Sequence, residues 1–234
     1  MARKPQAQKG KAKVLVIDDH PAVRSGVIAA INATHDLQVC GEAGNVREAK
    51  QILREQECDV VLLDLTLAGE SGLELIKDLA ARKRAAPTLV LSMHDEALYA
   101  ERSLRAGAKG YVMKDAPLEE VIVALRQVLA GDIHLSEAMR SRLLARMVGG
   151  RSASAGASPI ESLTDRELEV FELIGRGRRT QEIAESLHLS PRTIDTHREN
   201  IKRKLGLTDS TELHQHAFDW VRREDAGEGA PAKA

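Results

Sequence analysis

Three aspartates directly follow short aliphatic runs that are predicted to form buried strands. Asp18 and Asp19 follow the run 14–17, and Asp64 follows the run 60–63. Where parallel strands lie side by side, their carboxyl ends form the crevice in which ligands bind. Carboxylates gathered there repel one another and are usually tolerated only around a cation, and an all-oxygen ligand set favours Mg2+. The spacing therefore predicts a metal site at which Asp18 and Asp19 hold the ion.

Two further predicted strand ends carry a hydroxyl and an ammonium group. The run 88–91 leads to Ser92, and the run 110–113 leads to Lys114. A metal-bound carboxylate beside a lysine and a hydroxyl suits phosphoryl transfer, and we take the central Asp64 as the nucleophile, assisted by Lys114 and Ser92. A single aspartate after a strand is usually only a helix cap or a turn residue. The combination on four strand ends, in the right chain order, favours a functional site.

The elements that would position these residues lie between Lys13 and about Gly131. Five aliphatic runs, 14–17, 37–40, 60–63, 88–91 and 110–113, are each followed by a segment of helical periodicity. This alternation predicts a parallel sheet with helices on both faces. If the first and third strands are neighbours, as in the flavodoxin-like order 2-1-3-4-5, the three aspartates converge. Pro117 is predicted to occupy the first turn of the last of these helices, where its missing N–H costs nothing.

Length and composition place these elements in a chain of two small domains. The chain has 234 residues, with 34 Lys and Arg and 35 Asp and Glu, which give a net charge of -1. With this balance the overall charge of the protein does not indicate nucleic acid, a membrane or an acidic ligand as its partner. Aromatic residues make up 2% of the chain, which argues against a stacking platform for single-stranded nucleic acid. The longest aliphatic run is far shorter than the roughly 20 residues of a membrane span, so we expect no membrane partner and a cytoplasmic location.

The chain has only two cysteines, Cys40 and Cys58. They have no metal-ligand spacing and are too few for a disulfide framework, which is consistent with a reducing compartment. We expect both of them to be filler in the hydrophobic core.

Changes in composition mark the expected domain boundaries. Residues 1–12 form a basic tail that we expect to be disordered, and 13–131 form the first domain. Residues 132–159 contain a linker helix and a flexible segment rich in Gly, Ser and Ala. The second domain covers 160–223, and 224–234 form a second tail that we expect to be disordered.

The second domain has a purely helical pattern. Thr164 and Glu167 form a capping box at the start of one helix, and Thr180 and Ser190 begin two more. A last helix begins near Asp209. Two short helices joined by a turn predict a helix-turn-helix within a small all-α domain of four helices.

The helix predicted over 191–205 carries an apolar stripe and, opposite to it, a face rich in charge. Eight basic and four acidic residues lie between 176 and 204, so a basic patch exists within a neutral chain. The pattern predicts that this helix enters the major groove of double-stranded DNA. An ordinary solvated helix with mixed charges is the alternative, and composition alone favours it. The candidate DNA contacts are Thr180, Arg192, Thr193, Asp195, Thr196, Arg198, Glu199, Lys202, Arg203 and Lys204.

The first domain resembles a bacterial response-regulator receiver domain. The motifs that carry the resemblance are Asp18-Asp19, Asp64 with Gly69 and Ser71-Gly72, the run Leu91 to Asp95 and the run Ala106 to Lys114. One departure is Ala68, which stands where the family commonly has proline. This difference would make the loop after Asp64 less rigid without removing the chemistry.

The resemblance implies specific roles for the residues at the strand ends. A partner sensor histidine kinase would phosphorylate Asp64. Mg2+ would be bound by Asp19, Asp64 and the backbone carbonyl of Thr66, while Asp18 orders the metal through water. Ser92 and Tyr111 would form the switch pair, in which the hydroxyl moves toward the phosphoryl group as the ring turns inward. An aromatic residue on a strand is otherwise simply part of the core, so the role of Tyr111 stays open.

The second domain is similar to the LuxR-type DNA-binding domain over about 160–223. The similarity rests on the run Leu163 to Val170, on Glu182-Ile183-Ala184 and on the run Leu189 to Gly206. With the receiver, this makes the chain resemble a NarL/FixJ-family two-component response regulator. The resemblance implies that the helix beginning at Ser190 enters the major groove and that the last helix, about 209–222, helps to dimerise the DNA-bound form.

The favoured function is a transcription regulator, not an enzyme. Phosphorylation of the receiver would shift a two-state equilibrium and permit a homodimer to bind DNA. One alternative is a stand-alone enzyme of acyl-phosphate chemistry whose helical part only oligomerises, but an enzyme needs no basic helix face. Another alternative is a regulator that binds DNA regardless of phosphorylation, which the complete set of Asp, Ser and Lys residues makes less favoured.

Overall fold

Five parallel strands form a single sheet in the amino-terminal half of the chain. The computed structural model describes residues 10–67, 70–82, 85–149 and 159–225. The strands are β1 (Ala12–Ile17), β2 (Leu37–Ala43), β3 (Val60–Leu63), β6 (Thr88–Ser92) and β7 (Gly110–Met113). They lie in the order β2-β1-β3-β6-β7 and pair in parallel. Counted along the chain, these strands have the order 2-1-3-4-5, so the predicted flavodoxin-like topology is confirmed.

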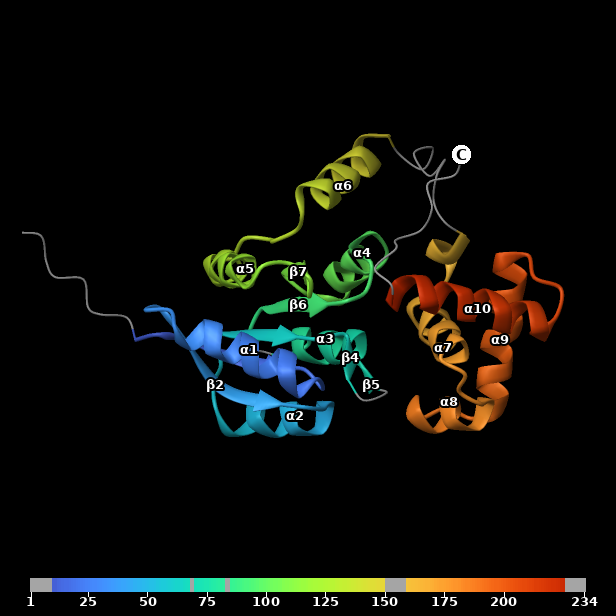
Figure 1. Ribbon diagram of the computed structural model, residues 1–234, viewed down its shortest axis with the longest axis horizontal. Coiled ribbons are helices and arrows are strands. Elements are labelled where there is room, and N and C mark those ends of the chain that lie inside the picture. The colour runs from blue at the N-terminus through green and yellow to red at the C-terminus, as the bar shows by residue number, and fades with distance from the viewer. Residues whose placement is uncertain (1–9, 68–69, 83–84, 150–158, 226–234) are drawn as a thin grey trace, which may run out of the picture.

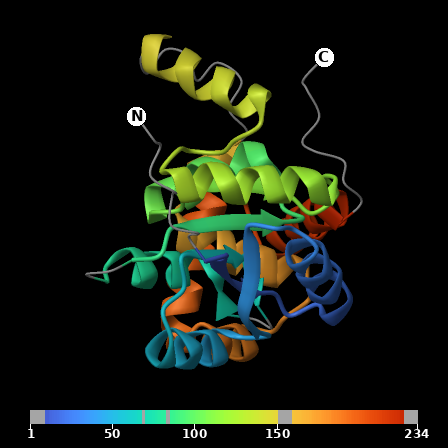
Figure 2. The same cartoon turned by 90° about the vertical axis from the view of Figure 1, so that its left-hand side faces the viewer.

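Helices cover both faces of this sheet (Figure 2). They are α1 (Pro21–Asn32), α2 (Val46–Glu55), α3 (Gly72–Ala80), α4 (Glu96–Ala106) and α5 (Leu118–Ala130). Because side chains alternate along a strand, Val14 and Val16 pack in one core with α1 and α5, while Leu15 and Ile17 pack in a second core with α2, α3 and α4. The sheet is therefore buried on both sides, as the uninterrupted aliphatic runs predict.

The loop after Asp64 contains a feature that the sequence pattern does not reveal. Strands β4 (Thr66–Leu67) and β5 (Glu70–Ser71) pair as a short antiparallel hairpin directly before α3. Gly72 follows the hairpin, and a Cβ atom there would lie 2.5 Å from the Cα of Leu65, so only glycine permits this close approach. Ala68 lies outside the described residues, and the expected effect of its replacing proline stays a prediction.

One predicted helix start needs a small correction. Pro117 is the N-cap residue of α5, and the first helical residue is Leu118. The prediction of Pro117 in the first turn was therefore wrong by one position. The physical reason for proline near a helix start still applies, because an N-cap nitrogen has no intrahelical acceptor.

The carboxyl-terminal part is a bundle of four helices. It contains α7 (Asp165–Gly175), α8 (Thr180–Ser186), α9 (Pro191–Leu205) and α10 (Ser210–Asp225), preceded by the short 3-10 helix η2 (Pro159–Ser162). The predicted capping box of Thr164 and Glu167 is present at the start of α7. At the end of α7, a Cβ atom on Gly175 would lie 2.3 Å from the carbonyl oxygen of Ala217, so glycine lets α10 pack against α7.

Helix α6 (Glu137–Gly149) lies between the two parts in the chain order and contacts both of them (Figure 1). Its Met139 is buried in the core that also contains residues of α4, and its Arg142 lies 2.7 Å from Oε1 of Glu161 in η2. The helix forms where the sequence predicts a linker helix. The expected flexible linker and most of the two expected tails lie outside the described residues, although β1 begins at Ala12 and α10 extends to Asp225. Among the described helices, none is long and apolar enough to cross a membrane.

Candidate functional site

The carboxyl ends of β1 and β3 bring three carboxylates together. Oxygens of Asp18, Asp19 and Asp64 and a ring nitrogen of His20 all lie within 4.8 Å of one another. Asp18 and Asp64 are each only 3% exposed. The convergence that the topology predicts is therefore present. His20 was not predicted; its Nδ1 lies 2.8 Å from Oδ1 of Asp19, and its only signal in the sequence is its place next to that aspartate.

Lys114, at the end of β7, is the counter-charge of this cluster. Its Nζ lies 2.8 Å from Oδ2 of Asp18 and 2.7 Å from Oδ2 of Asp64. Burial raises the pKa of Asp64, and the neighbouring ammonium of Lys114 offsets only part of this effect. Burial alone would lower the pKa of Lys114, but the charge of Asp64 and hydrogen bonds to both carboxylates outweigh burial and raise it. Lys114 is therefore charged and ion-paired at neutral pH.

The donor set fits a hard divalent cation. The buried oxygens belong to aspartates from two strands, and carboxylate oxygens are the ligands that Mg2+ prefers. A buried like-charge cluster also needs more positive charge than one lysine supplies. Thr66 lies next to the cluster, where its backbone N–H donates to Oδ1 of Asp64 at 3.3 Å. The role of its carbonyl oxygen as a metal ligand stays a prediction.

The two residues of the predicted switch pair are buried beside the cluster. Ser92 is 0% exposed and Tyr111 is 1% exposed. Both bond to the backbone of His94: its N–H donates to Oγ of Ser92 at 3.2 Å, and its carbonyl oxygen accepts from the hydroxyl of Tyr111 at 2.7 Å. A movement of Ser92 or Tyr111 would therefore act directly on the segment that carries His94.

The ring of His94 joins the loop after Asp64 to the other half of the molecule. Its Nε2 lies 2.9 Å from Oγ1 of Thr66, two residues after Asp64. The ring stacks on Tyr99 of α4 with a centroid separation of 4.4 Å, and Nε2 lies 3.8 Å from Oε1 of Glu172 in α7. Sequence reasoning gave His94 no role, because nothing in its spacing reveals a partner almost eighty positions away.

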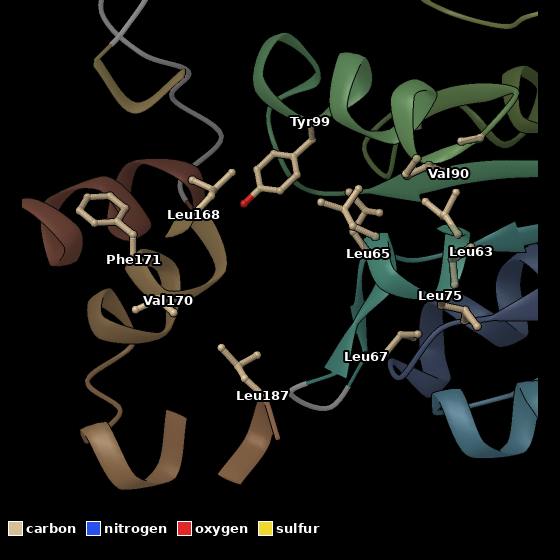
Figure 3. Packing of buried hydrophobic residues seen from close by; sticks show 14 of the residues in the cluster. Leu63, Leu65, Leu67, Leu75, Val90, Tyr99, Leu168, Val170, Phe171 and Leu187 are labelled. Carbon is tan, nitrogen blue, oxygen red and sulfur yellow. The ribbon is translucent and has the colours of Figure 1, made fainter. Parts of the chain in front are cut away.

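The receiver contacts the helical domain through α7 and the segment before it. Figure 3 shows Tyr99 of α4 projecting across the junction toward Leu168 of α7. The hydroxyl of Tyr99 donates to Glu172 at 3.3 Å. The hydroxyl of Ser71, at the end of the hairpin, donates to Oε1 of Glu169. One continuous apolar core therefore extends from the sheet face that carries α3 and α4 into the four-helix bundle.

Arg102 of α4 makes three hydrogen bonds across this junction. Its guanidinium donates to Oδ1 of Asp165 at 3.0 Å and to the carbonyl oxygens of Leu163 at 2.8 Å and Glu161 at 3.3 Å. Lys77 of α3 lies 3.3 Å from the other oxygen of Asp165. Because Arg102 is only 9% exposed, these contacts exchange little with water and fix the start of α7 on the receiver.

A cavity of about 330 Å3 lies at the same junction. Asp19, Thr66 and His94 line it from the receiver, and Glu169 and Glu172 line it from α7. The acidic cluster therefore opens toward the contact between the domains.

The predicted DNA-binding helix α9 starts with a well-formed cap. Oγ of Ser190 accepts the backbone N–H of Thr193 at 3.1 Å, and Pro191 occupies the first turn. The buried residues Ile194 and Ile201 face the bundle. On the other side lie exposed residues from the predicted set: Arg192, Asp195, Thr196, Glu199 and Arg203. α9 lies on the side of α7 that faces away from the receiver (Figure 1).

Other members of the predicted DNA-contact set have partners within the protein. Nζ of Lys204 lies 2.5 Å from Oε2 of Glu167, and a guanidinium nitrogen of Arg198 donates to Oγ1 of Thr180 at 2.9 Å. Burial would raise the pKa of Glu167, but hydrogen bonds from Lys204 and Thr164 outweigh burial and lower it. Lys204 therefore ties α9 to the start of α7.

Both domains match known families. Residues 14–126 match the response regulator receiver domain, and residues 161–217 match the luxR family of bacterial regulatory proteins. The oxygen regulatory protein NreC of Staphylococcus carnosus is 36% identical over 209 residues, which are 88% of this chain and 96% of that protein. The NreC of Staphylococcus aureus is 35% identical over the same length.

Solved structures agree with this assignment. A LuxR-family two-component response regulator from Aurantimonas sp. SI85-9A1 is 32% identical, with a TM-score of 0.55, and covers 59% of this chain and 99% of that chain. RcsB from Salmonella enterica serovar Typhimurium, bound to a promoter in the presence of phosphomimetic BeF3-, is 24% identical, with a TM-score of 0.70, and covers 90% of this chain and 100% of that chain. At this identity RcsB supports the fold alone.

The two domains define the kind of protein. A receiver domain implies a histidine kinase as partner, and a LuxR-type helix-turn-helix implies binding to DNA. The relatives are named as regulatory proteins, which places the chain among regulators and not among enzymes. The chain belongs to the NarL/FixJ family of two-component response regulators, in which phosphorylation of a receiver controls transcription through a LuxR-type domain.

Proposed function

We propose that a sensor histidine kinase transfers a phosphoryl group to Asp64 and that this transfer switches the chain to bind operator DNA as a homodimer. A carboxylate oxygen of Asp64 attacks phosphorus, a P–O bond forms, and the P–N bond to the donor histidine breaks. The observation that carries the proposal is the position of Asp64, which is buried beside Asp18 and Lys114, while the neighbouring Asp19 and Thr66 line the cavity at the domain junction. We place the reaction in the cytoplasm, where the operator is accessible.

The residues around Asp64 have separate tasks in this reaction. Lys114 is charged and lies within reach of the oxygens that the transferred group would bring. Asp18, Asp19, Asp64 and the Thr66 carbonyl would hold Mg2+, which when bound supplies positive charge against the phosphoryl oxygens. Ser92 would bond to the new phosphoryl group and Tyr111 would follow, and the bonds of both residues to the backbone of His94 support this coupling.

Four contacts in sequence support a route from Asp64 to the helical domain. Thr66 bonds to Asp64 through its N–H and to the ring of His94 through its hydroxyl. His94 in turn stacks on Tyr99, whose hydroxyl donates to Glu172 of α7. A phosphoryl group on Asp64 competes for Thr66 and Ser92, displaces His94 and weakens the contact with α7. The released domains can then pair as a dimer through α10.

The exposed face of α9 is the DNA-binding surface in this proposal. Arg192, Asp195, Thr196 and Glu199 reach base edges, while Lys202 and Arg203 contact phosphates. Asp195 and Glu199 would accept hydrogen bonds from cytosine amino groups, because as anions they repel phosphate. Lys204 is better explained as a structural residue, since Glu167 holds its ammonium group.

The experiment that tests this function is selection of DNA sites from random duplexes. The full chain is treated with Mg2+ and a small phosphodonor, and binding is compared with untreated protein, with Asp64→Asn and with Asp132→Asn. Asp132 is an exposed carboxylate outside the cluster, so its substitution is the matched control. We expect enrichment of a two-fold symmetric site in the treated wild type and in Asp132→Asn, and no response in Asp64→Asn.

Two other results would each contradict part of the proposal. Equal enrichment with and without phosphate would make the chain a phosphorylation-independent regulator. Absence of enrichment despite phosphate on Asp64 would indicate an output other than sequence-specific DNA binding.

A further inference from the structure

The two cysteines lie in contact on the sheet face that carries α2. Sγ of Cys40 is 3.2 Å from Sγ of Cys58, although eighteen positions separate the two residues in the chain. Both side chains are half-buried and pack at the edge of the core beneath α2. Besides packing against the core, each thiol is therefore in direct contact with the other.

A bulge in β2 places Cys40 in this position. Val39 pairs with Val14, but the next residue of β1, Leu15, pairs with Gly41, so Cys40 is an extra residue in β2. The carbonyl oxygen of this bulged Cys40 accepts a hydrogen bond from the side-chain amide of Gln56 at 2.9 Å. A Cβ atom on Gly41 would lie 3.0 Å from this same amide nitrogen, so glycine lets the end of α2 approach the bulge.

Cys58 lies in the connection between α2 and β3. The neighbouring Asp59 is fixed, because its Oδ2 accepts the backbone N–H of Lys13 at 2.7 Å. Burial and the contact with Cys40 raise the pKa of Cys58 to about 12. Cys58 is therefore a protonated thiol at neutral pH.

We propose that Cys40 and Cys58 form a reversible modification site, at which an oxidant of the peroxide class converts the two thiols into a disulfide. The sulfur of Cys40 attacks one peroxide oxygen, the O–O bond breaks, and the departing oxygen leaves as water with the proton of the Cys40 thiol, so that a sulfenic acid and one water form. The sulfur of Cys58 then attacks the sulfenic sulfur. The S–S bond forms as the hydroxyl group leaves with the proton of Cys58, as a second water.

The electrons and protons of this reaction balance. The two thiols together lose two electrons and two protons, and the peroxide is reduced to two molecules of water. A dithiol reductant reverses the reaction by exchange. The site needs no metal and no group from the acidic cluster. It lies before the amino end of β3, while Asp64 follows the carboxyl end of that strand, roughly 13 Å of strand away.

The disulfide would close a loop that contains all of α2. Such a crosslink stabilises a fold mainly by restricting the unfolded chain. Because it ties β2 to the start of β3 on either side of β1, it reinforces the edge of the sheet without touching the junction with α7. We therefore expect oxidation to raise the Tm of the receiver by roughly 5 °C and to leave phosphorylation of Asp64 unchanged.

The test treats the full-length protein with hydrogen peroxide, removes the oxidant and alkylates the denatured chain with N-ethylmaleimide. Intact mass then counts the thiols that are left. In the wild type, both alkylation sites are expected to disappear together, with a linked peptide in a non-reducing digest and full recovery after dithiothreitol. Peroxide-treated protein unfolded in urea serves as the control, and we expect it to form the bond at least about tenfold more slowly because proximity is lost.

Two variants separate the roles of the thiols. In Cys58→Ser, Cys40 is expected to stop at a sulfenic acid that dimedone traps. In Cys40→Ser, no linked peptide is expected to form, because Cys58 has lost its partner thiol. The proposal is overturned if one wild-type thiol is over-oxidised while the other stays free, or if the urea-unfolded chain forms the bond as fast as the native protein. These readouts do not depend on whether Asp64 or α9 has the function proposed above.

Discussion

The acidic cluster and the exposed face of α9 use charge in opposite ways. In the cluster, Asp18, Asp64 and Lys114 come from three different strands, are buried, and lie within 2.8 Å of an oppositely charged atom. On α9, the charged residues come from one helix, and Arg192 and Asp195 project into solvent. The first arrangement makes covalent chemistry possible on one residue, because its partners are fixed in advance. The second leaves side chains free to meet a partner of irregular shape.

The difference also predicts how each region responds to substitution. Removing a buried charge leaves its partner without compensation, so the fold itself is affected. Removing an exposed charge affects binding and leaves stability almost unchanged. The substitutions below test this contrast, from the largest expected effect to the smallest.

Lys114→Met should have the largest effect. It leaves Asp18 and Asp64 buried without their common counter-charge, and we expect a loss of about 4 kcal/mol in the free energy of unfolding at pH 7 without divalent metal. Urea denaturation measures this loss. Lys109→Met is the matched control, because Lys109 is exposed, and it should change stability by less than about 0.5 kcal/mol.

The same variant should change the pH dependence of stability. Burial raises the pKa of Asp64 in the folded protein, so this carboxyl favours folding at acidic pH, and its contribution is lost as the pH rises from about 3.9 through the raised value. Without Lys114 the pKa of Asp64 rises further. The stability difference between wild type and Lys114→Met should therefore shrink on going from pH 7 to pH 4, and a constant difference would contradict the ion-pair explanation.

On α9, Arg192→Ala should reduce discrimination between operator and random DNA by about 2 kcal/mol without changing stability. Lys202→Ala should weaken binding to both kinds of DNA and flatten the salt dependence of binding. Fluorescence anisotropy at several salt concentrations separates the two results. If both variants lose specific and random binding equally, the division between base contacts and phosphate contacts is wrong.

Glu167→Gln tests whether a charged residue of α9 can serve stability and not DNA binding. The partner of Glu167 is Lys204, which lies on α9 and bonds within the protein. We expect a loss of about 1.5 kcal/mol at pH 7, since a charge-assisted hydrogen bond and half of the capping box are lost. The pKa of Glu167 is lowered, so its contribution is present above about pH 4.3 and is lost as the pH falls through the lowered value. Glu185→Gln, at an exposed position on α8, should leave the unfolding curve unchanged at every pH.

Arg102→Ala tests the contact that couples the two regions. Without its bonds to Leu163 and Asp165, the closed arrangement is less favoured, and we expect the unphosphorylated chain to bind DNA about tenfold more tightly. Arg105→Ala on the same helix removes an exposed arginine that pairs only with its own helix neighbour Glu101 among the contacts described, and it should bind as the wild type does. An unchanged affinity in Arg102→Ala would mean that the junction does not restrain DNA binding.

Much of the acidic cluster and of the helical domain could be predicted, because the signals are local. An aliphatic run followed by Asp64 identifies a strand end, and Thr164 with Glu167 identifies a helix start from four consecutive positions. Arg102 and His94 gave no such signal, because their partners lie in another domain and at no fixed spacing. The hairpin of β4 and β5 was missed for a different reason, since strands of two residues have no detectable period.

The direction in which α9 faces has a consequence for the evolution of such regulators. The contacts with the receiver described above include residues of α7, while α9 lies on the side of α7 away from the receiver (Figure 1). If the exposed residues of α9 contact DNA as proposed, a copy made by gene duplication can change Arg192 or Glu199 and acquire new target genes while it still answers to its original kinase. Rewiring of the target and rewiring of the signal are, in this fold, separate mutational events.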